Sequence, residues 1–378
     1  MQSTNSPDVS IRSLRYVVRV LLVGSLALLS GCTSVGYYAQ AAQGQFSLLY
    51  KAKPINTWLS DSSVNEGLKT KLRRVQEIRE FAVRELGLPD NASYKNYADL
   101  KRPFVVWNVV ATPEFSLVPE QWCFPVAGCV DYRGYYDKEE ALNFAEDLRK
   151  KGLDVRVTGV PAYSTLGWFN DPVLSTFIHY PEPEVARLIF HELSHQVAYA
   201  AGDSPFNESF ATAVEEVGLS HWLNAHGDDT MRESYRVYRG RRDDFLALLN
   251  KYRLQLEATY RRPISDNEKR QHKSELMQSM QTDYSVLKQA WGGYTGYDRW
   301  FNEPVSNAHF ALIATYNDLV PEFKALLAEQ KTLPAFYAAV KTLADRDSHI
   351  RHQMLQRYKS VVHQSAVKNE SNNTAASQ

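Results

Sequence analysis

The chain has 378 residues, enough to bury a large hydrophobic core in one domain or in two closely packed ones. Its 43 lysines and arginines balance its 43 aspartates and glutamates. Charge therefore gives no argument for a nucleic-acid partner or for binding to an anionic membrane surface. The 22 tyrosines and 7 tryptophans suit a peptide-binding groove, but they suit a large core equally well.

The N-terminus has the pattern of a lipoprotein signal. Three arginines precede an apolar run over residues 20–29, which is too short to remain as a membrane-spanning anchor. The run ends in Leu29-Ser30-Gly31-Cys32, which looks like a lipobox, and in lipoproteins such a cysteine is acylated and becomes the first residue after cleavage. The alternative is an ordinary signal or short anchor with an incidental cysteine. We expect a signal peptide over residues 1–31, a lipid anchor to the membrane at Cys32 and, since Thr33 rather than Asp follows, an outer-membrane location facing the periplasm.

The first half of the mature chain has the pattern of an α+β fold. Residues 36–52 and 63–86 predict helices, and the hydrophobic period then changes to that of strands. Expected next are strands at 104–110, 130–136 and 154–157, with a helix at 138–151. Residues 176–180 could form an edge strand to which an extended peptide adds, or an ordinary buried strand or loop. Helices therefore surround a small sheet.

Two cysteines remain if Cys32 is lipidated. Cys123 and Cys129 are close enough in sequence to close a small loop around Pro125 and Gly128, in a compartment that is oxidising. A cysteine-based metal site is disfavoured because no other Cys or His has ligand spacing nearby. The sequence therefore predicts a disulfide between Cys123 and Cys129.

A helix over residues 184–201 carries the most informative motif of the chain. Pro181-Glu182-Pro183-Glu184 is typical of a helix start, and Gly202 indicates its end. His191 and His195 are one turn apart and present their imidazoles on one face, where two neutral nitrogens can hold a zinc ion. Glu192 beside them can take a proton from water. The alternative is a pair of ordinary core or surface histidines.

A second helix is expected from Asp203 or Ser204 to about residue 219. Glu208 lies in its first turns, a short connection away from His195, so its carboxylate can be the third zinc ligand. The alternative is an ordinary carboxylate that the positive end of the helix dipole stabilises. Three protein ligands leave a fourth position open, which indicates a catalytic rather than a closed structural zinc site.

The remaining chain is predicted to be nearly all helix. Helices are expected at 232–262, 266–290, about 302–329 and 333–360, and the first two carry many charged residues, as a solvated face does. The last dozen residues are polar and predicted to be disordered. We expect a signal peptide over 1–31, a metallopeptidase over 32–364 with an α+β part (33–180) and a helical part with the zinc site (181–364), and a disordered tail over 365–378.

The His191-Glu192-x-x-His195 motif with the later Asn207-Glu208-Ser209-Phe210-Ala211 resembles the gluzincin metallopeptidases, the group of thermolysin and of the aminopeptidase N family. The resemblance implies a zincin-like active-site helix with Glu208 as the third ligand. The connection to Glu208 is shorter than in those families, so a tight turn is expected. Thr212 stands where thermolysin-like enzymes have Asp, and Glu215 or Glu216 are the candidates to support a histidine instead.

The wider chain resembles the predicted aminopeptidase lipoproteins of Gram-negative bacteria. The resemblance is carried by Cys123–Cys129, Tyr132-Arg133-Gly134-Tyr135, Gly167-Trp168-Phe169, Asp171-Pro172-Val173-Leu174, the zinc motif, and Ala314-Thr315-Tyr316-Asn317-Asp318. It implies a zinc aminopeptidase that acts on peptide or protein substrates in the bacterial envelope.

In the expected mechanism Glu192 is the general base, and a further donor stabilises the oxyanion. Tyr316 is the preferred catalytic donor, and His309 and Tyr180 are the other candidates. No Gly-x-Met-Glu-Asn type segment of the aminopeptidase N family precedes the zinc motif, so a zinc endopeptidase of extended or misfolded periplasmic proteins is an alternative. A lipoprotein scaffold without turnover is another, and it would have no need of Glu192 as a base.

Overall fold

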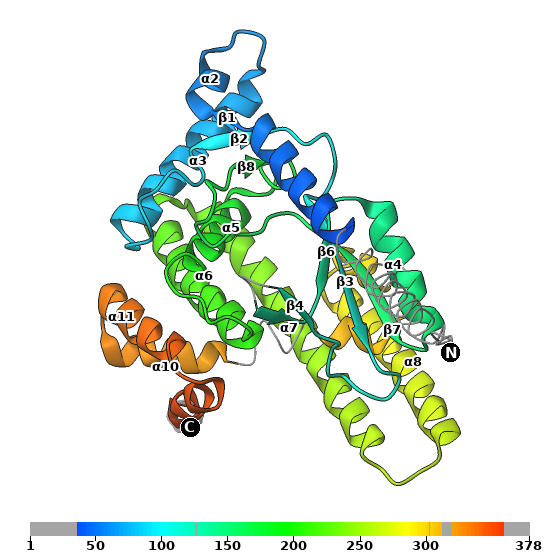
Figure 1. Cartoon of the computed structure of the whole chain (residues 1–378). Helices are drawn as coiled ribbons and strands as arrows, with labels where there is room; N and C mark the ends of the chain where they lie inside the picture. The colour runs from blue at the N-terminus through cyan, green and yellow to red at the C-terminus, as the bar shows by residue number, and fades with distance from the viewer. Residues whose placement is uncertain (1–35, 125–127, 302, 312–318, 359–378) are drawn as a thin grey trace, which may run out of the picture. The chain divides into compact units, whose positions relative to one another are not determined.

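The computed structural model describes residues 36–124, 128–301, 303–311 and 319–358 (Figure 1). It divides the chain into two units, Met1–Tyr50 and Lys51–Gln378, and each is described by itself. In the first unit the described residues, 36–50, are helical, and the helix extends to residue 51. The predicted helix over 36–52 is thus confirmed to within one residue.

The main sheet of the second unit has β3 at its centre. β3 (Val106–Thr112) pairs antiparallel with β6 (Arg133–Tyr135) on one side and with β7 (Asp154–Val160) on the other. α4 (Lys138–Lys150) packs on β3 and β7 (Figure 1). β3 has a nearly continuous apolar run because both of its faces are buried.

Two smaller sheets accompany the main one. β2 (Asn96–Ala98) pairs antiparallel with β1 (Lys53–Pro54) and parallel with β8 (Val173–Leu174). β4 (Trp122–Phe124) and β5 (Gly128–Val130) form a hairpin in which Cys123 opposes Cys129, and a disulfide joins the two cysteines. The first half is therefore α+β, as the changes of period predict.

Of the two alternatives for residues 176–180, the structure has the ordinary buried loop, and the edge strand is wrong. Residues 175–179 are turns, and the N–H groups of Phe177 and Ile178 both donate to the Leu174 carbonyl. Both side chains are buried. The apolar run therefore belongs to a buried turn, whose N–H groups are already used and cannot pair with an added strand.

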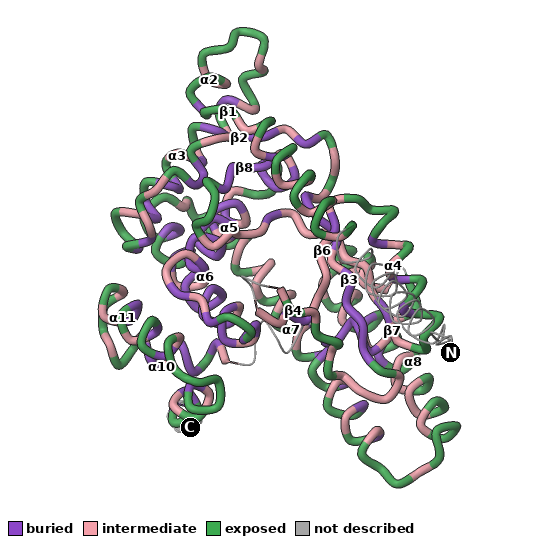
Figure 2. The backbone as a smooth tube through the Cα atoms, in the orientation of Figure 1, coloured by how far each residue is buried: buried purple, intermediate pink, exposed green. Residues whose placement is uncertain are grey.

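Four helices carry and support the predicted motif. α2 (Ile55–Ser60) and α3 (Glu66–Arg84) precede the main sheet, and α5 (Glu182–Ser194) and α6 (Ser204–His226) follow it. α5 lies against α6 and also contacts α3 (Figure 1). Both α5 and α6 are mostly buried (Figure 2), and α6 accordingly has only three Asp, Glu, Lys or Arg residues among its 23.

The helix predicted over 184–201 ends seven residues early, at Ser194, with His195 as its C-cap. Residues 198–200 leave the helix because the side-chain amide of Asn207 bonds both the N–H and the carbonyl of Ala200, each at 2.8 Å. The helix therefore ends without a Pro or Gly, since the Asn207 side chain satisfies the backbone groups of Ala200 outside the helix.

The helices of the second half confirm most of the predicted pattern. α7 (Asp229–Tyr260) and α8 (Asp266–Ala290) form an antiparallel hairpin, and Ser265 and Glu268 make a capping box at the start of α8. Around the turn of this hairpin the residues are largely exposed (Figure 2). A core cluster packs residues 245–256 of α7 against residues 280–284 of α8 and against Phe310.

The two last predicted helices are each interrupted. The region predicted as one helix over about 302–329 follows the 3-10 helix η1 (Asp298–Phe301) and contains a helical stretch at residues 307–311 and α10 (Val320–Gln330). α11 (Leu333–Ala344) and a further helix over residues 348–358 replace the one predicted over 333–360. The break near residue 346 arises because Arg351 takes the carbonyls of Leu343, Ala344 and Arg346.

The fold class is the one the sequence predicts: mostly helical α+β, with the strands in the N-terminal half and helices after α5. Within the described ranges, no helix is both long enough and apolar enough to cross a membrane.

The aromatic packing of α6 with the C-terminal helices predicts a large effect of core truncation. Phe336 is fully buried among Phe210, Phe323 and Tyr337. We expect Phe336→Ala to lower the free energy of unfolding by about 3–5 kcal/mol, measured by denaturant unfolding, because it leaves a cavity. Val286→Ala, at a side chain that is 62% exposed, should change it by less than about 0.5 kcal/mol. Equal effects would contradict the packing described.

Candidate metal centre

The end of α5 and the start of α6 bring three potential metal ligands together. Nε2 of His191 lies 3.2 Å from Oε2 of Glu208, and Nε2 of His195 lies 3.8 Å from the same oxygen. One ligand atom from each of the three residues lies within 4.8 Å of the others. Across the residues that the structure describes, no other His, Cys, Asp or Glu group of three has this property. Two imidazoles and one carboxylate are a donor set that suits zinc and leaves a position open.

A buried carboxylate fixes the orientation of His191. Oε2 of Glu215 lies 2.9 Å from Nδ1 of His191 and 2.9 Å from a guanidinium nitrogen of Arg187. Burial by itself would raise the pKa of Glu215, but Arg187 and His191 outweigh it and lower the pKa to about 2. The carboxylate is therefore ionised and accepts the Nδ1 proton, which leaves Nε2 of His191 as the atom facing Glu208.

The two candidate histidines differ in charge. Burial favours the neutral form of His191, but the carboxylates of Glu208 and Glu215 outweigh it and raise its pKa to about 10. Burial lowers the pKa of His195 to about 4, and its Nδ1 has no hydrogen-bond partner among the described residues. The cluster thus holds one positive charge, the proton on His191, between two carboxylates. A bound cation would compensate the same negative charge, so the residues present fit a metal.

Glu192 is buried beside the cluster. Burial raises its pKa to about 8, and the nearby carboxylates contribute in the same direction. Within the described part of the chain no hydrogen bond or ion pair engages its carboxyl group, which is therefore available to water or substrate. A carboxyl group with a pKa near neutrality can both take up and release a proton under physiological conditions.

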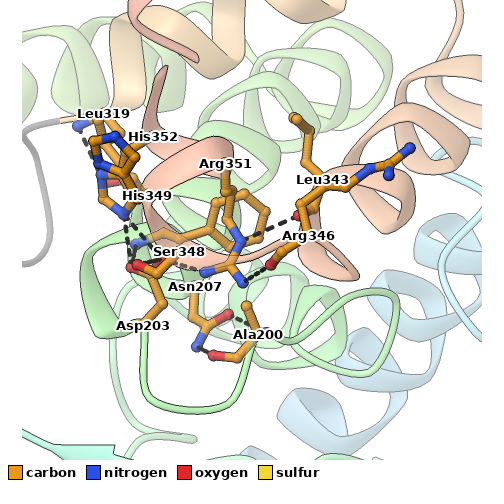
Figure 3. A network of polar contacts seen from close by, with 12 residues as sticks. Ala200, Asp203, Asn207, Leu319, Leu343, Arg346, Ser348, His349, Arg351 and His352 are labelled. Atoms are coloured by element: carbon orange, nitrogen blue, oxygen red, sulfur yellow. Dashed lines mark hydrogen bonds and ion pairs between the residues drawn. The ribbon is translucent and has the colours of Figure 1, made fainter. Parts of the chain in front are cut away.

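The connection between the two helices is held by α6 and by the C-terminal helix. Asp203 caps α6 by accepting the N–H of Phe206, and Asn207 binds both backbone groups of Ala200. Asp203 also pairs with Arg351 and His352 from the helix over 348–358 (Figure 3). The connection predicted as a tight turn is instead a longer, irregular segment over residues 195–203, which these bonds hold in place.

The disulfide hairpin contacts the same connection from another direction. Gly128 in β5 has a φ of +73°, and a Cβ at this position would lie only 2.5 Å from the backbone nitrogen of Gly202. Only glycine fits, because any side chain would collide with the backbone of residues 201 and 202. The hairpin that Cys123 and Cys129 close is therefore directly packed on the segment that joins the second and third ligands.

Polar residues around the end of α5 were not predicted. The Gln196 side chain donates to Asp171 and to Ser93, at 3.3 Å each, and accepts from Asn91 at 2.6 Å. Asp171 also accepts the N–H and hydroxyl of Thr165. Burial raises the pKa of Asp171, although these donors oppose the shift. Apart from the position of Gln196 next to His195, no spacing in the sequence indicates this network.

Two tyrosines near the cluster were also missed. Burial raises the pKa of Tyr199 to about 12, and the Glu208 carboxylate contributes to the shift. Burial likewise raises the pKa of Tyr94, with Glu192 as the next cause. Tyr94 has a φ of 61°, a strained conformation for a bulky residue, and its N–H donates to Asp171. Both rings therefore lie within electrostatic reach of the predicted ligand and base.

The predicted oxyanion donors are not brought to the cluster by any described contact. Tyr316 lies outside the described residues, as does Cys32. His309 is buried against Trp300, accepts the N–H of Ser306, and has its pKa lowered to about 3 by burial. Tyr180 lines a groove of about 520 Å³ between α3 and the start of α5, the end of α5 opposite to the metal ligands.

The family model that matches the chain is described as "Putative aminopeptidase", and the match covers residues 36–355. No curated protein and no solved structure matches the chain. The match includes both helices of the ligand cluster and the C-terminal helix as far as residue 355. It indicates a peptidase in general, and its description specifies neither a metal nor a location.

The role of Glu215 is tested by comparing it with its neighbour. Glu215→Gln should weaken zinc binding about 10–100-fold, because an amide no longer holds the His191 imidazole by a charged hydrogen bond. Affinity is measured by competition with a zinc chelator. Glu216 pairs with Arg239 and Lys324 instead, so Glu216→Gln should leave zinc affinity unchanged. Equal losses in the two variants would contradict the assignment.

The Asp203 pair predicts an acid-dependent stability. Burial opposes ionisation of Asp203, but His352, the Phe206 N–H and Arg351 lower its pKa. Stability from a carboxylate with a lowered pKa is present above the unfolded value of about 3.9 and is lost as pH falls through the folded value. Asp203→Asn should therefore lower the free energy of unfolding by about 3 kcal/mol at pH 7 and by progressively less below about pH 4. Denaturant unfolding over this pH series measures it, and a constant difference would contradict it.

Proposed function

Because the chain belongs to this aminopeptidase family, we propose that it is a zinc-dependent peptidase of the bacterial envelope, with His191, His195 and Glu208 as the ligands and Glu192 as the base. The observation that carries the proposal is the meeting of the three ligand atoms within 4.8 Å, beside a buried carboxyl group whose pKa is raised to about 8. A metal scaffold has no use for such a carboxyl group. A peptidase needs one that both accepts and returns a proton.

The roles of the residues follow from their surroundings. Zinc held by the two imidazoles and the Glu208 carboxylate would supply Lewis acidity toward a peptide carbonyl and acidify water. Glu192 takes the proton of the attacking water and passes it to the amine that leaves, so the C–N bond breaks as a neutral amine forms. Glu215 keeps the Nδ1 proton of His191 in place throughout. Burial of all these groups excludes bulk water and strengthens their electrostatic interactions.

An oxyanion donor completes the proposed mechanism. Tyr316 remains the proposed catalytic donor, on the basis of the sequence alone. Tyr199 and Tyr94 supply alternatives, since the electrostatic effects of Glu208 and Glu192 reach their hydroxyl groups. Replacement of each tyrosine by Phe, with kcat as the readout, distinguishes the three because only the donor stabilises the transition state.

The family description favours an aminopeptidase, and we propose this specificity first. An endopeptidase that cuts extended or misfolded periplasmic chains is the second candidate, favoured by the absence of a Gly-x-Met-Glu-Asn type segment. Peptides with free and with acetylated N-termini separate the two activities. We further propose that acylation of Cys32 anchors the enzyme to the outer membrane, facing the periplasm. Labelling with a radioactive fatty acid, in the wild type and in Cys32→Ala, tests the anchor.

The proposed function predicts a separation of metal binding from catalysis. Glu192→Gln should retain zinc at the wild-type ratio and reduce kcat for peptide hydrolysis by about 10³-fold or more, because the amide cannot carry a proton. Zinc content is measured by atomic emission, and hydrolysis with aminoacyl and internally quenched peptides.

Glu208→Ala should instead bind zinc much more weakly, so that zinc content and activity fall together, since only the two imidazole ligands remain. The matched control is Glu216→Gln on the same helix, which should retain both properties. If the wild-type protein binds zinc but hydrolyses no peptide, the proposed peptidase function is refuted and the protein is a zinc-binding protein.

A further inference from the structure

The third metal ligand stands on a different helix from the other two, and an irregular segment joins them. His195 is the C-cap of α5, and α6 begins at Ser204. Residues 198–200 and 203 have neither helical nor strand structure. The position of Glu208 relative to His195 therefore depends on what holds this segment at its junction with α6.

That junction is Asp203, a buried residue on which four groups converge. Its carboxylate accepts the N–H of Phe206 at 3.1 Å and the Ser348 hydroxyl at 3.3 Å. It accepts from Nε2 of His352, at 2.9 Å for the nearer oxygen, and it forms an ion pair with Arg351. Three of these four groups come from one helix, residues 348–358 (Figure 3).

Arg351 is held more firmly than an ordinary ion-pair partner. It is 5% exposed, and besides Asp203 it donates to the carbonyls of Leu343, Ala344 and Arg346. Its guanidinium lies 4.9 Å from the centre of the Phe206 ring, in the first turn of α6. A buried guanidinium that makes four hydrogen bonds, three of them to backbone carbonyls, cannot readily follow Asp203 if Asp203 moves, so it defines the position of the cap.

We propose that Arg351 is a positioning residue for the third metal ligand, together with Ser348 and His352. The C-terminal helix fixes Asp203, Asp203 fixes the first turn of α6, and this turn fixes the Glu208 carboxylate opposite His191 and His195. The inference rests on the metal centre of the proposed function. It adds that a segment more than 140 residues away in sequence completes that centre, since Asp203 and Arg351 are 148 residues apart.

The cluster is not a second catalytic site. Ser348, His352 and Asp203 are the residue types of a serine-hydrolase triad, but here the Ser348 hydroxyl donates to Asp203. In a triad the histidine must accept the serine proton, and the carboxylate must hold the far side of the histidine. In this cluster both the hydroxyl and the imidazole point at the same carboxylate, so nothing activates the serine.

The experiment is a double-mutant cycle on zinc affinity, with the full chain. Arg351→Met should weaken zinc binding about 10–100-fold, by competition with a chelator, because the third ligand loses its fixed position. In the Glu208→Ala background the same change should alter zinc affinity by less than about 2-fold, since there is no third ligand left to position. An equal loss in both backgrounds would overturn the proposal and leave Arg351 a stabilising residue only.

Two further variants test the proposal in case Arg351→Met does not fold. His352→Gln and Ser348→Ala each alter one contact to Asp203 and should weaken zinc affinity in the same direction, by about 2–10-fold each. The control is Arg102→Met, which removes an arginine bonded to the Tyr136 and Val105 carbonyls on the sheet side and should leave zinc affinity unchanged. Unchanged affinity in both His352→Gln and Ser348→Ala would overturn the proposal even if Arg351→Met does not fold.

The readout separates this inference from the proposed function. Zinc affinity is measured without turnover, so wild-type protein that binds zinc and hydrolyses no peptide refutes the peptidase and leaves the cycle valid. Additive losses in the cycle refute the positioning role and leave the peptidase unaffected.

Discussion

The packing of α5 against α6 places the carboxylates of Glu208 and Glu215 in a region from which water is largely excluded. The rest of the site follows from the negative charge of these two groups. A buried carboxylate must be paired with a cation or with hydrogen-bond donors, because its desolvation is otherwise prohibitive. Arg187 compensates Glu215 in the metal-free protein, and a proton on His191 compensates Glu208. A divalent cation held by the two imidazoles and Glu208 would compensate the same negative charge, and its binding would release the His191 proton.

The same packing explains why the connection between the ligands needs external support. A short link between two buried antiparallel helices cannot satisfy its own backbone, so other elements supply the bonds. Asn207 supplies them from α6, and the hairpin containing Gly128 packs on the link from the sheet side. The disulfide within that hairpin limits how far Gly128 can withdraw. Asp203 and its partners hold the end of the link that joins α6. Segments distant in sequence therefore together fix the connection between α5 and α6.

The sequence predicted the ligand cluster well because its signal is local. His191 and His195 are one helical turn apart, and Glu208 follows a cap and a proline that set the start of α6. Residues 184–201 were predicted as one helix because they contain no helix-breaking residue. The position at which the backbone leaves the helix depends instead on the side chain of Asn207, which lies outside that segment. The buried turn at 175–179 was given as a possible strand for a related reason. A buried turn and a strand can both be short apolar runs in sequence, and only tertiary contacts distinguish them.

The supporting residues were beyond sequence reasoning for a different physical reason. Asp171, Gln196 and Arg351 act through hydrogen bonds between segments separated by 25 to 148 residues, and no periodicity connects such positions. Arg351 in particular lies in an ordinary charged stretch, where an arginine is usually solvated. Its guanidinium is buried at the break after α11, where it donates to three backbone carbonyls, and the sequence shows neither the break nor these bonds.

The buried carboxyl groups of this region also differ in a way that supports Glu192 as the proposed base. Asp171 and Asp203 are each saturated with donors, so their protons and positions are fixed and they serve as supports. Glu215 is ionised and locked between Arg187 and His191. Glu192 is as buried as these three, yet none of the residues the structure describes donates to it, and its pKa is raised to about 8. A protein keeps a buried carboxyl group unsatisfied where the group has work other than support. This difference supports the proposal that Glu192, between the two histidines, is the residue whose proton moves.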